Sequence, residues 1–354
     1  MKKVLIIIFI LLSFFKVKAN ELVPNAKNAI LIEPTTKTVI YEKDSHTEVS
    51  VASLTKMMGL ILIFEQIDAG KIKYTDIVTA SANAAGMGGS QIWLSAGEEM
   101  SVEDLLKGII MASGNDAIVA MAEYVSGSEE NFVKMMNDKA KELGLKNTNF
   151  VNPTGLDEKG HFSSAYDLAL IATELMKHED VFKFTTIYED YLRKNTDNKF
   201  WLVNTNKLIN SYKGADGLKT GMTDAAGYCM AVTAKRNGMR LLAIVLGEKE
   251  GKVRNKETTE LLDYGFNTYE VTTSKNKDDV VGEITIDKAN PERIEAKVKS
   301  DVTILRKIGK LLVKDGNNTI KQVDLVSSGN MEKRGFFELW LNLIKSVLTG
   351  DLIN

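Results

Sequence analysis

A run of apolar residues from Ser53 to Ala69 constrains the fold more than any other internal segment of the sequence. Methionine, leucine, isoleucine and phenylalanine side chains would lie on every side of a helix here, and Gly70 follows in the usual helix-ending position. A helix that is apolar all round is buried by the rest of the protein. The chain is therefore predicted to wrap around this segment, although its first turn carries Ser53 and, one turn later, Lys56.

The first residues have the pattern of a secretory signal peptide. Lysines follow Met1, an apolar stretch runs from Val4 to Phe15, and Ala19 precedes the expected cleavage site. The stretch is shorter than the roughly 20 residues of a membrane-spanning helix, with an uncleaved anchor as the alternative. We expect residues 1–19 to be removed and the mature protein to act in the periplasm or on the extracytoplasmic face of the cell membrane.

Composition excludes several classes of protein. Loss of residues 1–19 changes the formal charge from −2 to −6, because four lysines and no acidic residues are removed. A mildly acidic chain with mixed charges gives no sign of nucleic-acid binding. The single cysteine, Cys229, cannot form an internal disulfide, and a buried structural role is expected for it. The three histidines lack metal-ligand spacing, so no metal or other cofactor is predicted.

Residues 20–268 are predicted to form an α+β domain whose antiparallel sheet joins both ends of the domain. A hairpin is expected over residues 29–42, and Asn237-Gly238 marks a second hairpin turn after Gly217. Helical patterns dominate from Ser101 to Leu143, recur at 164–177, and form a last polar helix that ends near Gly265.

The remaining chain changes character twice. Short β-rich runs predict a small all-β domain over residues 269–331. Residues 332–354 place Phe336, Phe337 and Trp340 at helical spacing with lysines and arginine nearby, which predicts an amphipathic helix lying in a membrane surface. The alternative is a helix that packs on its own protein.

The Ser53-x-x-Lys56 spacing places both side chains on one face of a helix. A serine hydroxyl is a poor nucleophile until a base takes its proton, and a lysine amine is such a base only when burial or a neighbouring cation lowers its pKa. The same spacing recurs at Ser13–Lys16 and Ser274–Lys277, but neither site can bury its lysine.

Two further motifs could complete a site around this pair. In "MASGNDA", Ser113 offers a second hydroxyl for proton relay and Asn115 an amide for a substrate carbonyl. In "GLKTGMT", Lys219 and Thr220 can bind a carboxylate, and Gly221 lets a substrate backbone approach the strand closely. Lys219 would also add a positive charge that helps keep the Lys56 amine neutral.

In this order, Ser-x-x-Lys, Ser-x-Asn and Lys-Thr-Gly resemble the motifs of penicillin-binding proteins and serine β-lactamases. The strings "ASLTKMM", "SGNDA" and "DGLKTGMTDAAGYC" resemble the low-molecular-mass D-alanyl-D-alanine carboxypeptidases in particular. The resemblance spans about Ala29 to Gly265 and continues more loosely to the C-terminus. It implies a β-lactamase/transpeptidase-like domain, then a small β domain and an amphipathic tail.

The resemblance also implies a reaction. Ser53 would attack the carbonyl between two D-alanines of a peptidoglycan pentapeptide, releasing the terminal D-alanine and leaving an acyl-enzyme that water hydrolyses. Lys56 would be the base, with Ser113 and Lys219 in the proton-relay network. A β-lactam antibiotic would be trapped as a slow ester on Ser53.

Substrate-binding roles follow from the same resemblance. The backbone N–H groups of Ser53 and Met222 would form the oxyanion hole, and Asn115 would hold the substrate amide. Thr220 would bind the terminal carboxylate, with Arg254 as a candidate partner. The chain departs from many relatives in having Met222 after Lys-Thr-Gly, where histidine is common, but a backbone N–H suffices there. A second departure is the threonine in "NTN", where some relatives have arginine, which leaves the carboxylate more dependent on Thr220 and Arg254.

Other readings share these motifs. A class A β-lactamase needs Glu-x-x-Leu-Asn, and the nearest match begins at Glu142 but has Lys146 in place of Asn. An endopeptidase that cuts D-alanyl cross-links uses the same residues. A β-lactam sensor or a non-catalytic scaffold would be acylated or folded without turnover of substrate.

Overall fold

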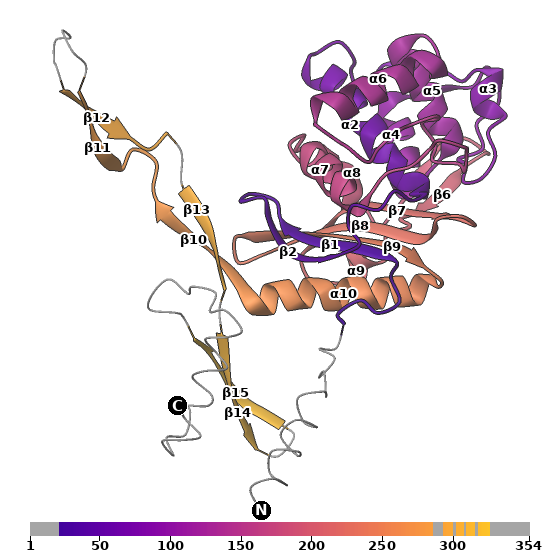
Figure 1. Ribbon diagram of the computed structural model, residues 1–354. Coiled ribbons are helices and arrows are strands. Elements are labelled where there is room, and N and C mark those ends of the chain that lie inside the picture. The colour runs from indigo at the N-terminus through magenta and orange to yellow at the C-terminus, as the bar shows by residue number, and fades with distance from the viewer. Residues whose placement is uncertain (1–20, 286–292, 300–301, 308, 316–317, 326–354) are drawn as a thin grey trace, which may run out of the picture. The chain divides into compact units, whose positions relative to one another are not determined.

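The computed structural model describes residues 21–285, 293–299, 302–307, 309–315 and 318–325 (Figure 1). The predicted signal peptide (1–19) and amphipathic helix (332–354) lie outside these ranges. The chain divides into two compact units, one of residues up to 267 with 271–305, the other of residues 268–270 with those from 306 on. The motif residues all belong to the first unit.

A five-stranded antiparallel sheet organises the first unit. Its order is β2-β1-β9-β8-β7, which places the first strand beside the last one. The strands are β1 (Asn28–Glu33), β2 (Thr38–Lys43), β7 (Ala215–Thr223), β8 (Gly227–Arg236) and β9 (Met239–Glu248). Both predicted hairpins are confirmed, and Asn237 and Gly238 take the positive φ angles that a tight turn between β8 and β9 needs. The predicted α+β class is confirmed.

Both faces of this sheet are covered (Figure 1). One face carries α10 (Gly251–Thr268), and the other carries the main group of helices. All residues of β1 are consequently buried, and β9 is buried except at Arg240. Two-sided burial explains why both strands read as nearly continuous apolar runs rather than as alternating ones.

The helical layer surrounds α2 (Lys56–Asp68), the apolar helix expected from the sequence. Nine of its residues, Lys56 through Phe64, are buried, and Gly70 follows with φ +68. A short 3-10 turn, η1 (Ala52–Thr55), precedes it, so Ser53 lies just before the α-helix.

The other helices of this layer are α4 (Val102–Met111), α5 (Asn115–Ser126), α6 (Glu129–Glu142) and α7 (Ala165–Leu175). Smaller elements are α3 (Ala82–Ala85), α8 (Val181–Thr185) and α9 (Leu208–Ser211), with hairpins β3 (Ile77–Thr79)–β4 (Glu99–Ser101) and β5 (Glu189–Leu192)–β6 (Phe200–Val203).

Gly265 corrects one expectation. The sequence predicts that the last polar helix ends there, but α10 continues to Thr268. An added Cβ at Gly265 would lie 2.5 Å from Leu241 Cδ1 and 2.9 Å from Leu31 Cδ2. The glycine therefore permits close packing of the helix on the sheet and does not terminate it.

Among the residues that the structure describes after α10 there are six strands, consistent with the β-rich pattern, and the domain limits 269–331 stay a prediction. They pair as β10 (Tyr269–Lys275) with β13 (Val302–Lys307), β11 (Val280–Thr285) with β12 (Arg293–Lys297), and β14 (Gly309–Asp315) with β15 (Asn318–Leu325). Within the described residues, no helix has both the length and the apolar character needed to cross a membrane.

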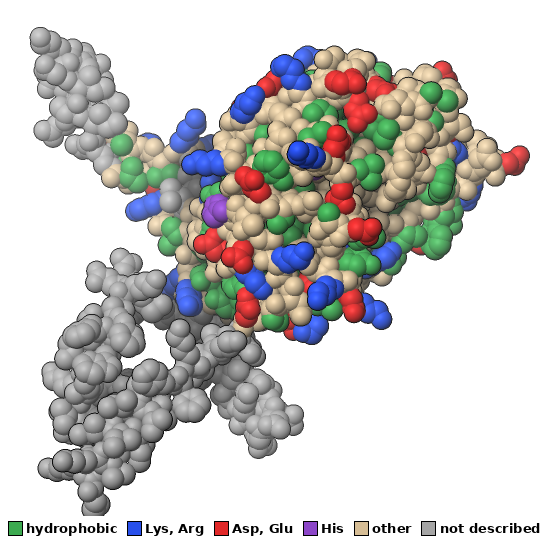
Figure 2. All heavy atoms as spheres, turned by 45° about the vertical axis from the view of Figure 1, so that its right-hand side comes forward, with side chains coloured by type: hydrophobic (Ala, Val, Ile, Leu, Met, Phe, Trp, Pro, Cys, Tyr) green, Lys and Arg blue, Asp and Glu red, His purple; other side chains and the backbone are tan. Residues whose placement is uncertain are grey.

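Acidic and basic side chains are interspersed on the face drawn in Figure 2, without a broad area of one sign among its described residues. This distribution matches the near-balance of 45 basic and 47 acidic residues in the chain. Such a surface does not steer a strongly charged polymer toward this face.

Candidate active site

Ser53 occupies a tightly enclosed turn. Ala52 before it has φ +49, an unfavourable conformation for alanine, and its carbonyl lies against Gly155. A Cβ on Gly155 would be only 1.9 Å from that oxygen, and Gly155 itself has φ +81. The nucleophile candidate is thus positioned by a close backbone contact that only glycine allows.

Lys56 lies fully buried beside Ser53. Its Nζ is 2.9 Å from Ser53 Oγ, 2.6 Å from Asn115 Oδ1 and 2.6 Å from the Thr154 carbonyl oxygen. Burial lowers the pKa of Lys56 well below its usual value, and the charge of Lys219 lowers it further. A neutral amine donates two N–H bonds, which suit the two carbonyl-type oxygens, and keeps a lone pair for the Ser53 hydroxyl. This geometry would allow Lys56 to take the proton of the Ser53 hydroxyl.

Ser113 and Asn115 lie where α4 gives way to α5. Ser113 has φ +63, is 5% exposed, and its Oγ has no hydrogen-bond partner among the described residues. Asn115 accepts from Lys56 through Oδ1 and donates through Nδ2 to the Gly88 carbonyl at 2.7 Å. An unsatisfied buried hydroxyl is costly, by about 1–3 kcal/mol, so the free Ser113 Oγ marks a position that suits a reacting molecule.

Strand β7 brings the Lys-Thr-Gly motif next to Ser53. A Cβ on Gly221 would lie 2.9 Å from the backbone N of Ser53, so the strand passes directly against η1. Lys219 and Thr220 are buried, whereas Met222 is 54% exposed. Burial, assisted by the charge of Arg254, lowers the pKa of Lys219 to about 7. Both motif lysines therefore lose charge more readily than surface lysines.

Arg254 lies on α10 and acts on the site from a distance. Its guanidinium donates to the Cys229 carbonyl at 3.3 Å and to Asn255 Oδ1 at 3.1 and 2.9 Å. Cys229, which is buried as expected, is the register partner of Gly221 across the β7–β8 ladder. The described hydrogen bonds of Arg254 thus reach the strand behind the motif, and its charge acts on Lys219.

Sequence reasoning missed the loop that supplies the Thr154 carbonyl. Asn152 Oδ1 accepts from the backbone N–H groups of Thr154 and Gly155, at 3.2 and 2.8 Å, and so folds the loop back on itself. A main-chain oxygen can belong to any residue, so no residue type marks it. The glycine in "PTG" was the available signal, because a positive φ and a close approach both require it.

His161 ties this loop to the nucleophile turn. The Val151 N–H donates to Nδ1 at 3.1 Å, which leaves the ring proton on Nε2, 2.8 Å from Thr55 Oγ1. Burial lowers the pKa of His161 to about 4, so the ring is neutral near pH 7. The spacing of the histidines in the sequence bears only on metal binding and gives no sign of this role. No group of three or more potential metal-binding side chains occurs among residues that the structure describes.

Comparison with known proteins identifies relatives of this chain. A peptidase S11 family model, described as D-alanyl-D-alanine carboxypeptidase, matches residues 16–250. The chain is 51% identical to the D-alanyl-D-alanine carboxypeptidase DacF of Bacillus subtilis over 311 residues, which cover 88% of this chain and 80% of that one. It is 40% identical to DacC of Escherichia coli, with 70% of this chain and 63% of the relative covered.

Solved structures give the same fold. Penicillin-binding protein 5 from Haemophilus influenzae superposes with a TM-score of 0.75 at 28% identity, covering 87% of this chain and 94% of that one. Penicillin-binding protein D2 from Listeria monocytogenes, solved in an ampicillin-bound form, gives a TM-score of 0.62 at 32% identity, covering 68% and 98%.

Acidification is expected to weaken the fold through His161. The pKa of His161 is about 4 in the folded protein, against an ordinary histidine value of about 6.5, so the unfolded chain binds more protons between these values. The contribution is complete above pH 6.5 and is lost as the pH falls toward 4. Between pH 7.5 and 5 this loss amounts to about 2 kcal/mol.

The test compares denaturant unfolding of the wild type and His161→Gln at both pH values. Glutamine keeps a donor and an acceptor but does not titrate. The wild type should lose about 2 kcal/mol more than the variant on acidification. If both proteins lost the same free energy of unfolding on acidification, His161 would not be the group responsible.

Proposed function

The chain belongs to the D-alanyl-D-alanine carboxypeptidase family of serine peptidases and is an enzyme of that activity, and we propose that Ser53 is its nucleophile and Lys56 its base. The observation that carries the assignment is the fully buried Lys56 amine, 2.9 Å from Ser53 Oγ, with a strongly lowered pKa. A base of this kind can accept a proton near neutral pH. Penicillin binding through the same serine is general in this family.

The reaction follows from this pair. Ser53 Oγ forms a bond to the carbonyl carbon of the penultimate D-alanine while its proton passes to Lys56 Nζ. The proton then moves to the nitrogen of the terminal D-alanine as the peptide bond breaks, which leaves an ester on Ser53. Water attacks the ester, gives a proton to Lys56, and the Ser53 oxygen leaves with a proton returned from the amine.

Ser113 is suited to carry the proton to the leaving nitrogen. Its Oγ is buried and has no partner among the described side chains and backbone groups, so it is available for a substrate. We place Lys219 in the same relay, since its pKa of about 7 allows both protonation states near neutrality.

Developing negative charge on the substrate oxygen needs donors that are already in position. The backbone N–H groups of Ser53 and Met222 are proposed to supply them. Support comes from Gly221, which brings β7 within van der Waals contact of the Ser53 backbone nitrogen. Met222 contributes only its main chain, consistent with its exposed side chain.

Recognition of the substrate ends is assigned to the remaining motif residues. Thr220, with Lys219 when protonated, binds the terminal carboxylate, and Asn115 holds the substrate amide through its second Nδ2 hydrogen. Arg254 supports the carboxylate site through its charge. The contacts of Arg254 with Cys229 and Asn255 favour this indirect role over direct binding.

Release of D-alanine from a diacyl-Lys-D-Ala-D-Ala tripeptide tests the assignment. Mature wild-type protein should release D-alanine, and Ser53→Ala should lose this activity because no ester can form. Ser274→Ala is the matched control, since Ser274 opens a second Ser-x-x-Lys spacing but is exposed. Release by Ser53→Ala would refute the nucleophile. A penicillin adduct without release by the wild type would instead favour an endopeptidase or a sensor.

Gly221→Ala should slow acylation without unfolding the protein. The added Cβ would meet the Ser53 backbone nitrogen at 2.9 Å, so β7 has to move away from η1 and the oxyanion donors separate. Loss of one such donor costs roughly 100-fold in rate. Gly251→Ala is the control, because its Cβ meets only Tyr228 at 3.4 Å. The measurement is the second-order rate of labelling by fluorescent penicillin, and an unchanged rate would contradict the model.

We further propose that the protein is exported and attached to the outer face of the cell membrane by residues 332–354. The support is the sequence pattern of the signal peptide and of the aromatic, lysine-flanked tail. Deletion of 332–354 should move the mature protein from the membrane fraction to the soluble fraction while D-alanine release from the tripeptide persists. Continued sedimentation with membranes would disprove the anchor.

A further inference from the structure

The side chain of Trp93 projects from the protein surface. It belongs to residues 88–94, here called the Trp93 segment, whose backbone is fixed by hydrogen bonds. Its neighbours Ile92 and Leu94 are buried, but Trp93 is 69% exposed and has φ +61. Positive φ is unfavourable for a bulky side chain, by about 1–3 kcal/mol. A strained residue that exposes a large indole is unexpected for folding alone and indicates a function at the surface.

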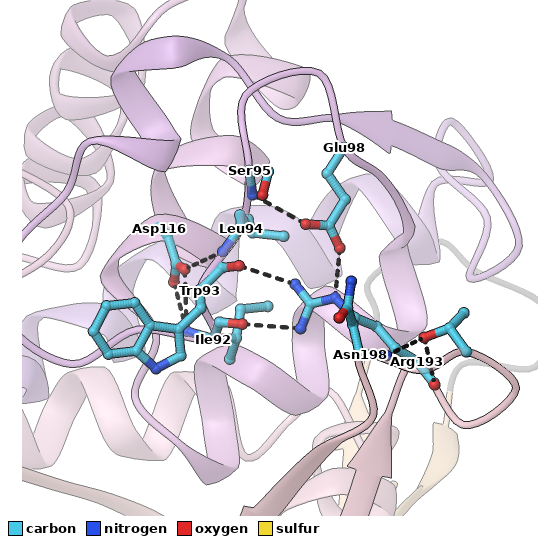
Figure 3. Close-up of polar contacts among 9 residues, drawn as sticks. Ile92, Trp93, Leu94, Ser95, Glu98, Asp116, Arg193 and Asn198 are labelled. Carbon is cyan, nitrogen blue, oxygen red and sulfur yellow. Dashed lines mark hydrogen bonds and ion pairs between the residues drawn. The ribbon is translucent and has the colours of Figure 1, made fainter.

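Two charged side chains fix this segment from opposite sides (Figure 3). The buried Asp116 carboxylate accepts from the backbone N–H groups of Ile92 and Leu94, each at about 3 Å. The Arg193 guanidinium donates to the Ile92 and Trp93 carbonyl oxygens at 3.0 and 3.2 Å. Figure 3 shows the indole projecting away from Arg193, so the position of Trp93 is set by its backbone.

The segment lies between the candidate active site and a large cavity. At one end, Asn115 donates to the Gly88 and Ser90 carbonyl oxygens, both at 2.7 Å. At the other end, a cavity of about 910 Å³ opens beside Trp93. Asp116 directly follows Asn115 in the first turn of α5. This turn therefore connects Asn115, which is proposed to hold the substrate amide, with the backbone on both sides of Trp93.

The cavity lining is suited to a sugar. It includes hydroxyl and amide groups, both signs of charge, and an aromatic side chain, contributed among others by Ser95, Glu99, Thr196, Asn198, Lys199 and Phe200. Hydroxyl and amide side chains can hydrogen-bond the hydroxyl groups of a sugar, and an exposed indole offers a flat apolar surface for the C–H face of a pyranose ring. The mixed charges do not favour a strongly acidic or basic ligand.

We infer that Trp93 and the adjoining cavity bind the glycan strand that carries the stem peptide. This inference rests on the proposed function, which places the D-alanyl end of the peptide at Ser53. An extended five-residue stem spans at most about 18 Å, so the sugar to which it is attached stays within that distance of Ser53. On the enzyme surface, the segment that carries Trp93 lies next to Asn115, which donates a hydrogen bond to its Gly88 carbonyl.

The test compares two substrates that differ in the sugar. Trp93→Ala should leave kcat/KM for the diacyl-Lys-D-Ala-D-Ala tripeptide within twofold. On purified glycan chains with intact pentapeptides it should lower kcat/KM about tenfold, the effect of losing one aromatic contact of about 1.4 kcal/mol. Trp201→Ala, which removes another exposed indole that does not line the cavity, should match the wild type on both substrates.

Direct binding gives an independent readout. In a Ser53→Ala protein with Trp201→Phe and Trp340→Phe, Trp93 is the one remaining tryptophan of the chain's three, and its fluorescence should change on addition of chitotetraose. No fluorescence change, or an equal loss of activity on both substrates with Trp93→Ala, would overturn the glycan site. Absence of tripeptide hydrolysis by the wild type would instead refute the proposed function, while chitotetraose binding would still be measurable.

Discussion

The chemistry proposed for this protein depends on the exclusion of water from the amine of Lys56. An ammonium group buried without a counter-charge is unfavourable, so Lys56 becomes neutral and is available as a base. Asp116, the acid that acts on it, does not neutralise this effect, because its oxygens accept backbone N–H bonds from the Trp93 segment. The apolar helix α2 excludes water from one side of the amine. Two oxygens, from Asn115 at the start of α5 and from the Thr154 main chain, lie 2.6 Å from the amine nitrogen.

Close backbone approaches hold these parts together. Gly155 receives the Ala52 carbonyl, and Gly221 brings β7 against the Ser53 nitrogen. Both contacts converge on the short η1 turn, which has little freedom to move once the loop and the strand have docked. His161 adds a neutral hydrogen-bond bridge between the same loop and Thr55. Ser53 is therefore positioned by contacts with segments that are distant in sequence, and not by the helix alone.

Much of this could be predicted from the sequence, for a physical reason. The roles proposed for Ser53, Lys56 and Lys219 belong to side chains whose chemistry is evident from residue type, as does the role proposed for Asn115. The all-round apolar pattern of α2 required burial. Thr154 acts through its main-chain oxygen, which leaves no mark on residue type. Gly265 was misread as a helix end because a glycine that ends a helix and one that allows packing look alike in sequence. They are separated only by knowing that Leu31 and Leu241 lie beneath.

The pairing of β1 with β9 has a consequence for how the chain acquires its structure. Asn28 lies opposite Leu246, so the strand made first has to wait for the strand made last before the sheet can close. Contacts of such long sequence separation form slowly. A nascent chain cannot complete this sheet until residue 246 has left the ribosome, and until then β1, apolar on both faces, can pair only with its neighbour β2. Synthesis therefore runs ahead of the closure of the sheet, and the edge of β1 that later pairs with β9 stays open during that period.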